Sequence, residues 1–224
     1  MLVVSHFIDT TLLVLALGGS GERPPAILMS GGEALRGDAS VELSIPARHQ
    51  APDSPKSGWC GETAIQEALL HFGVWAPQRL INRSGKPKHP DLYSSDIPIA
   101  LRGLGMKYEF YAPRKPGFAA YLDWMRQALD AGEPVLAGVK LLPTRHPEWG
   151  LDHFVLVVGY GPKGLLVNTT WGNQQWANDQ STQGISFANV GYGIRLHGVV
   201  SPPSTLPARL SVVEEAERIV RTFL

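Results

Sequence analysis

The stretch Ser57-Gly58-Trp59-Cys60-Gly61-Glu62-Thr63-Ala64 holds the only cysteine of the chain and marks a change from loop to helix. The residues before it contain two prolines, which favours a loop. After it, apolar residues recur at helical spacing, and Gly73 is typical of a helix end. Cys60 is therefore predicted in the first helical turn, where free backbone N–H groups and the helix dipole favour a thiolate. The alternative reading of this stretch alone is a small buried thiol that opens a helix.

Composition restricts the class of protein. The chain has 224 residues, of which 44% are hydrophobic and 18% charged, as expected for a globular domain with extensions. Its 20 Lys and Arg residues equal its 20 Asp and Glu residues, so it lacks the basic excess typical of proteins that bind nucleic acid or anionic membranes. A single cysteine excludes an internal disulfide framework and a zinc site built from cysteines.

Three regions are expected along the chain. Residues 1–38 combine an apolar run with a glycine-rich linker, which suggests a signal peptide. However, no Lys or Arg precedes the run, so the alternative is a poorly ordered N-terminus, and the run is too short for stable membrane insertion. A cleaved signal would place the protein in a secreted or periplasmic compartment, and otherwise it would be cytoplasmic. Residues 39–200 form the main domain, and residues 201–224 are a proline-rich linker and an amphipathic helix.

The main domain reads as α+β. Helical periodicity and end signals predict helices over 60–72, 76–81, 96–104 and 118–129. Strand patterns fall at 41–45, 107–111, 134–140, 152–160, 164–168 and 190–196. The intervening polar segments 82–93 and 171–184 are predicted as loops. Because helices dominate the first half and strands the second, we expect N-terminal helices packed on a mostly antiparallel sheet.

A cysteine nucleophile needs a base, and histidine suits that role near neutral pH. Of the seven histidines, His153 stands at the start of an almost wholly apolar strand, so its ring is expected at a sheet edge. The alternative is a histidine with ordinary hydrogen bonds in the core. A metal site is disfavoured, because Asp152 and His153 are strand neighbours that point to opposite faces.

These residues carry a family resemblance. The run Asp152-His153-Phe154-Val155-Leu156-Val157-Val158-Gly159-Tyr160-Gly161, followed by Leu165-Leu166-Val167-Asn168-Thr169-Thr170-Trp171-Gly172, resembles the His strand and its partner in papain-like cysteine peptidases. Gly58-Trp59-Cys60-Gly61 is similar to the Cys block of the compact bacterial branch, which includes the double-glycine (bacteriocin-leader, C39-like) peptidases. The papain Cys signature itself is absent. The resemblance covers about residues 41 to 197.

The resemblance implies roles for individual residues. Cys60 would be the nucleophile, His153 the general base, and the oxyanion hole would use the Cys60 N–H with the side chain of Gln50. Gln50 lies ten residues before Cys60, a long gap that requires residues 52–56 to loop out. Three groups could orient His153. Asn168 could do so if a bulge turns it inward, Thr169 could act as a weaker acceptor, or the backbone could serve.

The resemblance also implies that Trp59, Gly61 and Trp171 line the substrate site, with Trp171 covering the histidine from water. The predicted function is a thiol hydrolase that cleaves peptide or related amide bonds, with a peptide or protein substrate and without a metal or organic cofactor. The alternative is a weak or inactive papain-like domain that binds a peptide or protein partner in its cleft. The sequence gives no indication of an oligomeric state.

Overall fold

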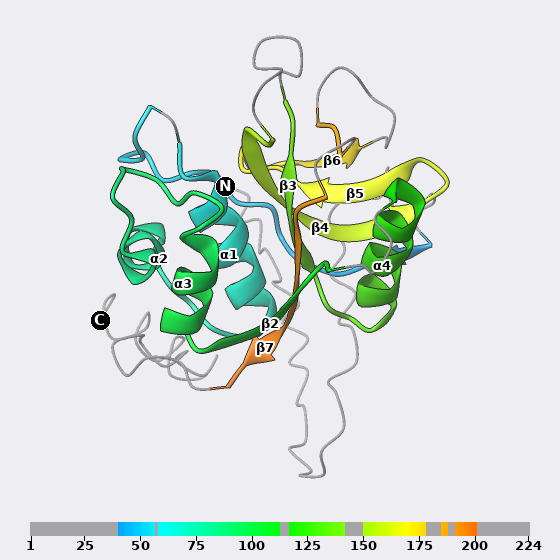
Figure 1. The fold of residues 1–224 in the computed structure, drawn as a ribbon, viewed down its shortest axis with the longest axis horizontal. Helices are drawn as coiled ribbons and strands as arrows, with labels where there is room; N and C mark the ends of the chain where they lie inside the picture. Colours follow the sequence, from blue (N-terminus) through cyan, green and yellow to red (C-terminus); the bar gives the residue numbers. More distant parts are fainter. Residues whose placement is uncertain are drawn as a thin grey trace, which may run out of the picture.

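The computed structural model describes residues 40–56, 58–112, 117–141, 150–177, 185–187 and 191–200. The predicted signal peptide and the predicted C-terminal helix lie outside the described residues. Within these ranges, a central antiparallel sheet has helices on both faces (Figure 1). The prediction of an α+β fold, with the cysteine helix packed on an antiparallel sheet, is confirmed.

The helices α1 to α3 lie together on one side of the sheet and α4 lies on the other (Figure 1). Their bounds are Cys60–His71 for α1, Gln78–Gly85 for α2, Ile97–Gly103 for α3 and Phe118–Asp130 for α4. Gly73, predicted to end a helix, adopts a positive φ angle of 77°, and Gly105 and Gly132, which follow α3 and α4, adopt 69° and 76°. Glycine carries little steric penalty in that conformation, which explains the choice of residue at these ends.

The sheet contains β1 (Val41–Glu42), β2 (Met106–Phe110), β3 (Val135–Val139), β4 (His153–Gly161), β5 (Gly164–Asn168), β6 (Gln174–Ala177) and β7 (Gly193–Val199). The strand order is β2-β7-β3-β4-β5-β6, with β1 added beside β4, and every pairing is antiparallel. The strand β4 is flanked by β3 and by β5, an interior position that suits its almost wholly apolar sequence.

Two apolar cores lie on the two faces of this sheet. On β4, Phe154, Leu156 and Val158 pack into the core that contains the buried residues of α1, α2 and α3. Val155 and Val157 point the other way, into the core formed with α4. This alternation is the period of a strand, and it makes β4 the wall between both cores. The start of β4 is thereby held in place next to α1.

Two segments predicted as loops contain regular structure. The helix α2 continues through Gly85, where a Cβ atom would lie 2.2 Å from a methyl carbon of Leu92, so glycine allows close packing there. The segment after Trp171 contains β6, which pairs with β5 at the edge of the sheet. Its polar residues hide the strand pattern, because an edge strand need not bury alternate side chains.

Candidate active site

Cys60 is the first residue of α1. The thiol lies beside two backbone N–H groups, those of Phe154 and Gly61. The pairing of β5 with β4 stops at Asn168, opposite Leu156, so the first residues of β4 are not covered by β5. The helix end that carries Cys60 therefore meets β4 one residue from His153.

The His153 ring is held by two residues of the turn that follows β5. Its Nε2 atom lies 3.3 Å from the hydroxyl oxygen of Thr170. Trp171 stacks on the ring with a centroid distance of 4.9 Å and an interplanar angle of 9°. His153 is buried, whereas Trp171 is 44% exposed, so the indole separates the imidazole from solvent.

The Gln50 side chain connects the cysteine loop to this histidine. Its Oε1 accepts a hydrogen bond of 2.6 Å from the Trp59 backbone N–H, and its Nε2 donates to the Thr170 hydroxyl over 3.0 Å. A backbone N–H can only donate, so this contact fixes which end of the amide faces Thr170. Gly58 permits the approach, because its φ is +84° and a Cβ there would lie 2.3 Å from Gln50 Oε1.

A single hydroxyl thus touches both the glutamine and the histidine. Because Gln50 Nε2 can only donate, Thr170 Oγ1 accepts from it and retains a second lone pair for a donor at His153 Nε2. When the ring is protonated, its Nε2–H donates to this oxygen. The arrangement leaves Nδ1 as the ring nitrogen for exchange of a proton with another group.

The ring contact expected from Asn168 or Thr169 is made by Thr170 instead. The Asn168 side chain donates to the Ile45 carbonyl over 2.9 Å and accepts from Gln174 over 3.0 Å. The Thr169 hydroxyl donates within its own turn to Asn173. Strand alternation applies to Asn168 but ends before Thr170, which lies in a turn, and this explains why the sequence pattern missed it.

Of the three residues expected to line a substrate site, only Trp171 is exposed. Trp59 is 6% exposed, and its indole N–H donates to the Pro90 carbonyl over 2.9 Å. Gly61 is also buried, and a Cβ there would meet Ile97 Cδ1 at 2.8 Å. Trp59 reaches the site through its backbone N–H, and Gly61 allows α1 to pack closely.

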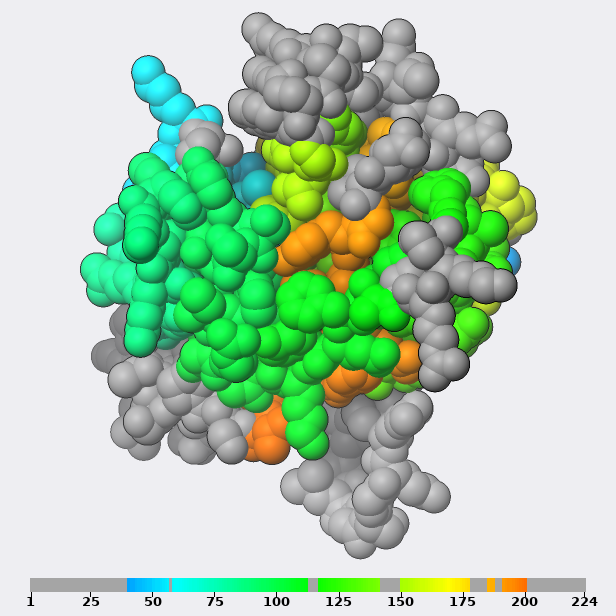
Figure 2. Space-filling model, in the orientation of Figure 1, coloured from blue at the N-terminus to red at the C-terminus, as the bar shows by residue number. Residues whose placement is uncertain are grey.

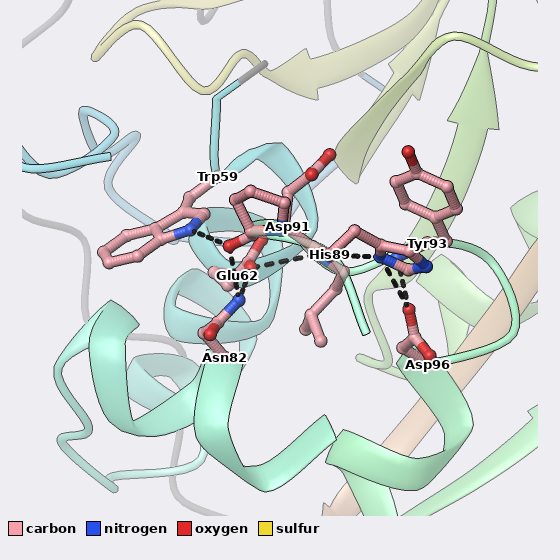
Figure 3. Close-up of polar contacts among 9 residues, drawn as sticks. Trp59, Glu62, Asn82, His89, Asp91, Tyr93 and Asp96 are labelled. Atoms are coloured by element: carbon pink, nitrogen blue, oxygen red, sulfur yellow. Dashed lines mark hydrogen bonds and ion pairs between the residues drawn. The ribbon is translucent and has the colours of Figure 1, made fainter. Parts of the chain in front are cut away.

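A polar network holds the segment 89–96 against the start of α1 (Figure 3). The Glu62 carboxylate accepts hydrogen bonds from Asn82 Nδ2 at 2.7 Å and from the Leu92 N–H at 3.0 Å. Its other oxygen is buried and has no hydrogen-bond partner within the described residues. Burial raises the pKa of Glu62 to about 7. This carboxyl therefore titrates near neutral pH, two residues from Cys60.

Burial dominates the protonation of the cysteine and the histidine. It raises the pKa of the Cys60 thiol to about 12, outweighing the N–H groups of Phe154 and Gly61, and the charges of Glu62 and Asp91 act in the same direction as burial. It lowers the pKa of His153 to about 4, against a small opposing effect of Asp152. At neutral pH this burial favours a thiol at Cys60 and a neutral imidazole at His153, contrary to the thiolate expected from the helix end.

An open pocket of about 500 Å³ lies beside the histidine. Gln50, Lys56, His153, Thr170 and Trp171 are among the residues that line it. In Figure 2, blue residues from the segment after β1 and yellow-green residues near the start of β4 meet at the surface. The pocket gives solvent-borne molecules access to the group that includes Gln50 and His153.

The described part of the chain shows neither a cluster of metal ligands nor a membrane-spanning helix. No group of three or more His, Cys, Asp or Glu side chains there is arranged to hold a metal ion. None of the helices there combines the length and the apolar character needed to cross a membrane.

Comparison with solved structures establishes the fold. A C39-like peptidase from Bacillus anthracis superposes with a TM-score of 0.51 and 13% identity, covering 72% of this chain and 98% of its own. A double-glycine motif protease from an AMS/PCAT transporter, solved with its leader peptide, has a TM-score of 0.49 and 12% identity. The match covers 70% of this chain and 96% of that protease. The peptidase domain of Streptococcus ComA, a bifunctional ABC transporter of a quorum-sensing pathway, has a TM-score of 0.47 and 14% identity. The match covers 69% of this chain and 98% of that domain.

The sequence comparisons found no relative: no family model matches the chain, and no curated protein matches it. The structural match alone shows that the chain has the papain-like fold of C39-like peptidase domains. At this level of identity, activity must be argued from the residues themselves.

A second buried carboxyl, that of Glu67, binds the backbone two residues before Gln50. Glu67 of α1 is 0% exposed and accepts a hydrogen bond of 2.7 Å from the Arg48 N–H. Burial raises the pKa of Glu67 to about 8, and the contacts with Arg48 and Asn168 oppose this only partly. The folded state therefore binds a proton that the unfolded chain releases at lower pH, so the folding free energy depends on pH.

We predict that the protein loses stability as pH rises from 6.5 to 8. In this range Glu67 is ionised in the unfolded chain and still protonated in the fold, so the unfolded state binds fewer protons and unfolding becomes easier. The expected loss is on the order of 1–2 kcal/mol. Urea unfolding at both pH values measures it, and Glu67→Gln should remove most of the slope. Equal slopes in the wild type and the variant would contradict this account.

Proposed function

We propose that this chain is a thiol hydrolase that cleaves peptide or related amide bonds, with Cys60 as nucleophile and His153 as general base and acid. The observation that carries the proposal is the Gln50 side chain, which joins the Trp59 N–H beside Cys60 to the hydroxyl on His153. These contacts support the proposal, because they join an oxyanion donor to an orienting hydroxyl on the base, next to the residue that precedes the nucleophile.

Acylation begins with proton transfer. The Cys60 thiol gives its proton to His153 Nδ1 while the sulfur forms a bond to the substrate carbonyl carbon. The carbonyl oxygen becomes an oxyanion, which accepts hydrogen bonds from the Cys60 N–H and from the second hydrogen of Gln50 Nε2. Thr170 accepts from the imidazolium Nε2–H at this stage. Its hydroxyl stabilises the positive charge that the step creates.

The remaining steps return the enzyme to its starting state. The tetrahedral intermediate collapses, the C–N bond breaks, and His153 gives its proton to the leaving amine. The resulting thioester is attacked by water, whose proton goes to His153. When the C–S bond breaks, the imidazolium protonates the sulfur, and the acid product leaves.

A specific observation favours a second candidate, a domain that binds a peptide in its cleft and turns it over slowly. The resting pair is neutral, so the thiolate must be made during the reaction. The group on His153 is a hydroxyl at 3.3 Å rather than a carboxylate or an amide. Such an acceptor stabilises an imidazolium less than a charged one does.

We predict that Cys60→Ala abolishes turnover of a peptide library and of p-nitrophenyl acetate, because Cys60 is the only cysteine of the chain and the proposed nucleophile. Liquid chromatography with mass spectrometry measures peptide products, and absorbance measures the released phenolate. Turnover that survives the substitution would contradict the hydrolase. Peptide binding by the wild type with little or no turnover would instead identify the second candidate.

We predict that Thr170→Val lowers kcat/KM about 2- to 12-fold. The substitution keeps the shape but removes a hydrogen bond worth about 0.5–1.5 kcal/mol. Thr170→Ser retains the hydroxyl and should stay close to the wild type. Steady-state kinetics on the same substrate compares them, and equal values for Val and Ser would show that the hydroxyl plays no part.

A further inference from the structure

The backbone on both sides of Gln50 is bound by a buried side chain of α2. Building on the function proposed above, we infer that Gln78 is a positioning residue that holds Gln50 where its amide serves the oxyanion and Thr170. Residues 48–51 are called the glutamine segment below. No sequence motif includes Gln78, so this role could not be predicted from the sequence.

The Gln78 amide binds the backbone group before Gln50 and the one after it. Its Nε2 donates to the His49 carbonyl over 2.8 Å, and its Oε1 accepts from the Ala51 N–H over 2.7 Å. Gln78 is the first residue of α2 and is 5% exposed. One rigid amide therefore fixes the backbone on both sides of the residue whose side chain enters the site.

The amide of Gln78 is also anchored to the cysteine helix. The second hydrogen of its Nε2 donates to Gln66 Oε1 over 3.1 Å, and Gln66 Nε2 donates to the Ala76 carbonyl over 2.7 Å. Both hydrogens of Gln78 Nε2 donate and its Oε1 accepts, so this buried amide has hydrogen-bond partners at both ends. The position of Gln50 is thus tied to α1, the helix that begins with Cys60.

The opposite edge of the glutamine segment is paired with the turn after β5. Gln50 N–H donates to the Thr170 carbonyl over 2.9 Å, and Gly172 N–H donates to the Arg48 carbonyl over 3.1 Å. Gln78 on one edge and this pairing on the other leave the segment little freedom. Without Gln78, the His49 carbonyl and the Ala51 N–H would lose their partner, and Gln50 would be held from one edge only.

The experiment compares Gln78→Met with the wild type, in chains with and without Gln50→Ala. The probe is p-nitrophenyl acetate, and the readouts are kcat, KM and melting temperature. We expect Gln78→Met to lower kcat at least tenfold with little change in KM, because an oxyanion donor acts in the transition state. In the Gln50→Ala background the same substitution should change kcat less than about twofold.

A variant of α4 controls for loss of stability. Met125 is buried in the core on the other face of the sheet, so Met125→Ala should lower the melting temperature but leave kcat unchanged. If Gln78→Met does not fold, Gln78→Asn takes its place: it keeps an amide but is one carbon shorter, so it cannot hold both His49 and Ala51. Its loss of kcat should also disappear in the Gln50→Ala background.

The outcomes separate this inference from the proposed function. If Cys60→Ala leaves turnover of the ester intact, the hydrolase itself is refuted. If Cys60→Ala abolishes turnover but Gln78 substitution lowers kcat equally with and without Gln50, the hydrolase stands and the positioning role is overturned. Unchanged kcat in folded Gln78 variants would overturn it as well.

Discussion

The contact of the Gln50 amide with the Trp59 N–H is the constraint on which the candidate site depends. It brings the loop before α1 to the turn after β5, and so links the cysteine helix to the histidine strand. The amide can bind in one orientation only, because the donor at Trp59 is a backbone N–H. Gly58 leaves room for this contact, and Gln78 fixes the backbone on either side.

Burial is the second physical theme of the site. The same packing buries His153 and partly buries Cys60, and it favours the neutral form of each. The nearby carboxyl of Glu62 adds a negative charge once it ionises, which further disfavours a thiolate. In the hydrolase proposed above, the neutral histidine would act as a general base, and charge would be created during attack rather than stored beforehand.

The sequence predicted those parts of the structure that depend on local patterns. Apolar periodicity after Cys60 and the apolar run after His153 were enough to place α1 and β4. Local patterns could not predict β6, whose polar residues lie at a sheet edge. They also could not predict the contact of Thr170 with His153, because a turn sets the direction of that side chain. The protonation of Cys60 and the bracing by Gln78 depend on tertiary burial and on contacts between distant segments, which no local pattern records.

The most direct test of this account is a crystal structure of the protein treated with a peptide aldehyde, which forms a hemithioacetal with a reactive thiol. We expect the adduct on Cys60, with its oxygen within about 3.2 Å of Gln50 Nε2, as for a hydrogen bond. Thr170 Oγ1 should remain at His153 Nε2. An unmodified Cys60, or an adduct whose oxygen lies away from Gln50, would contradict the central claim that this glutamine assembles the site.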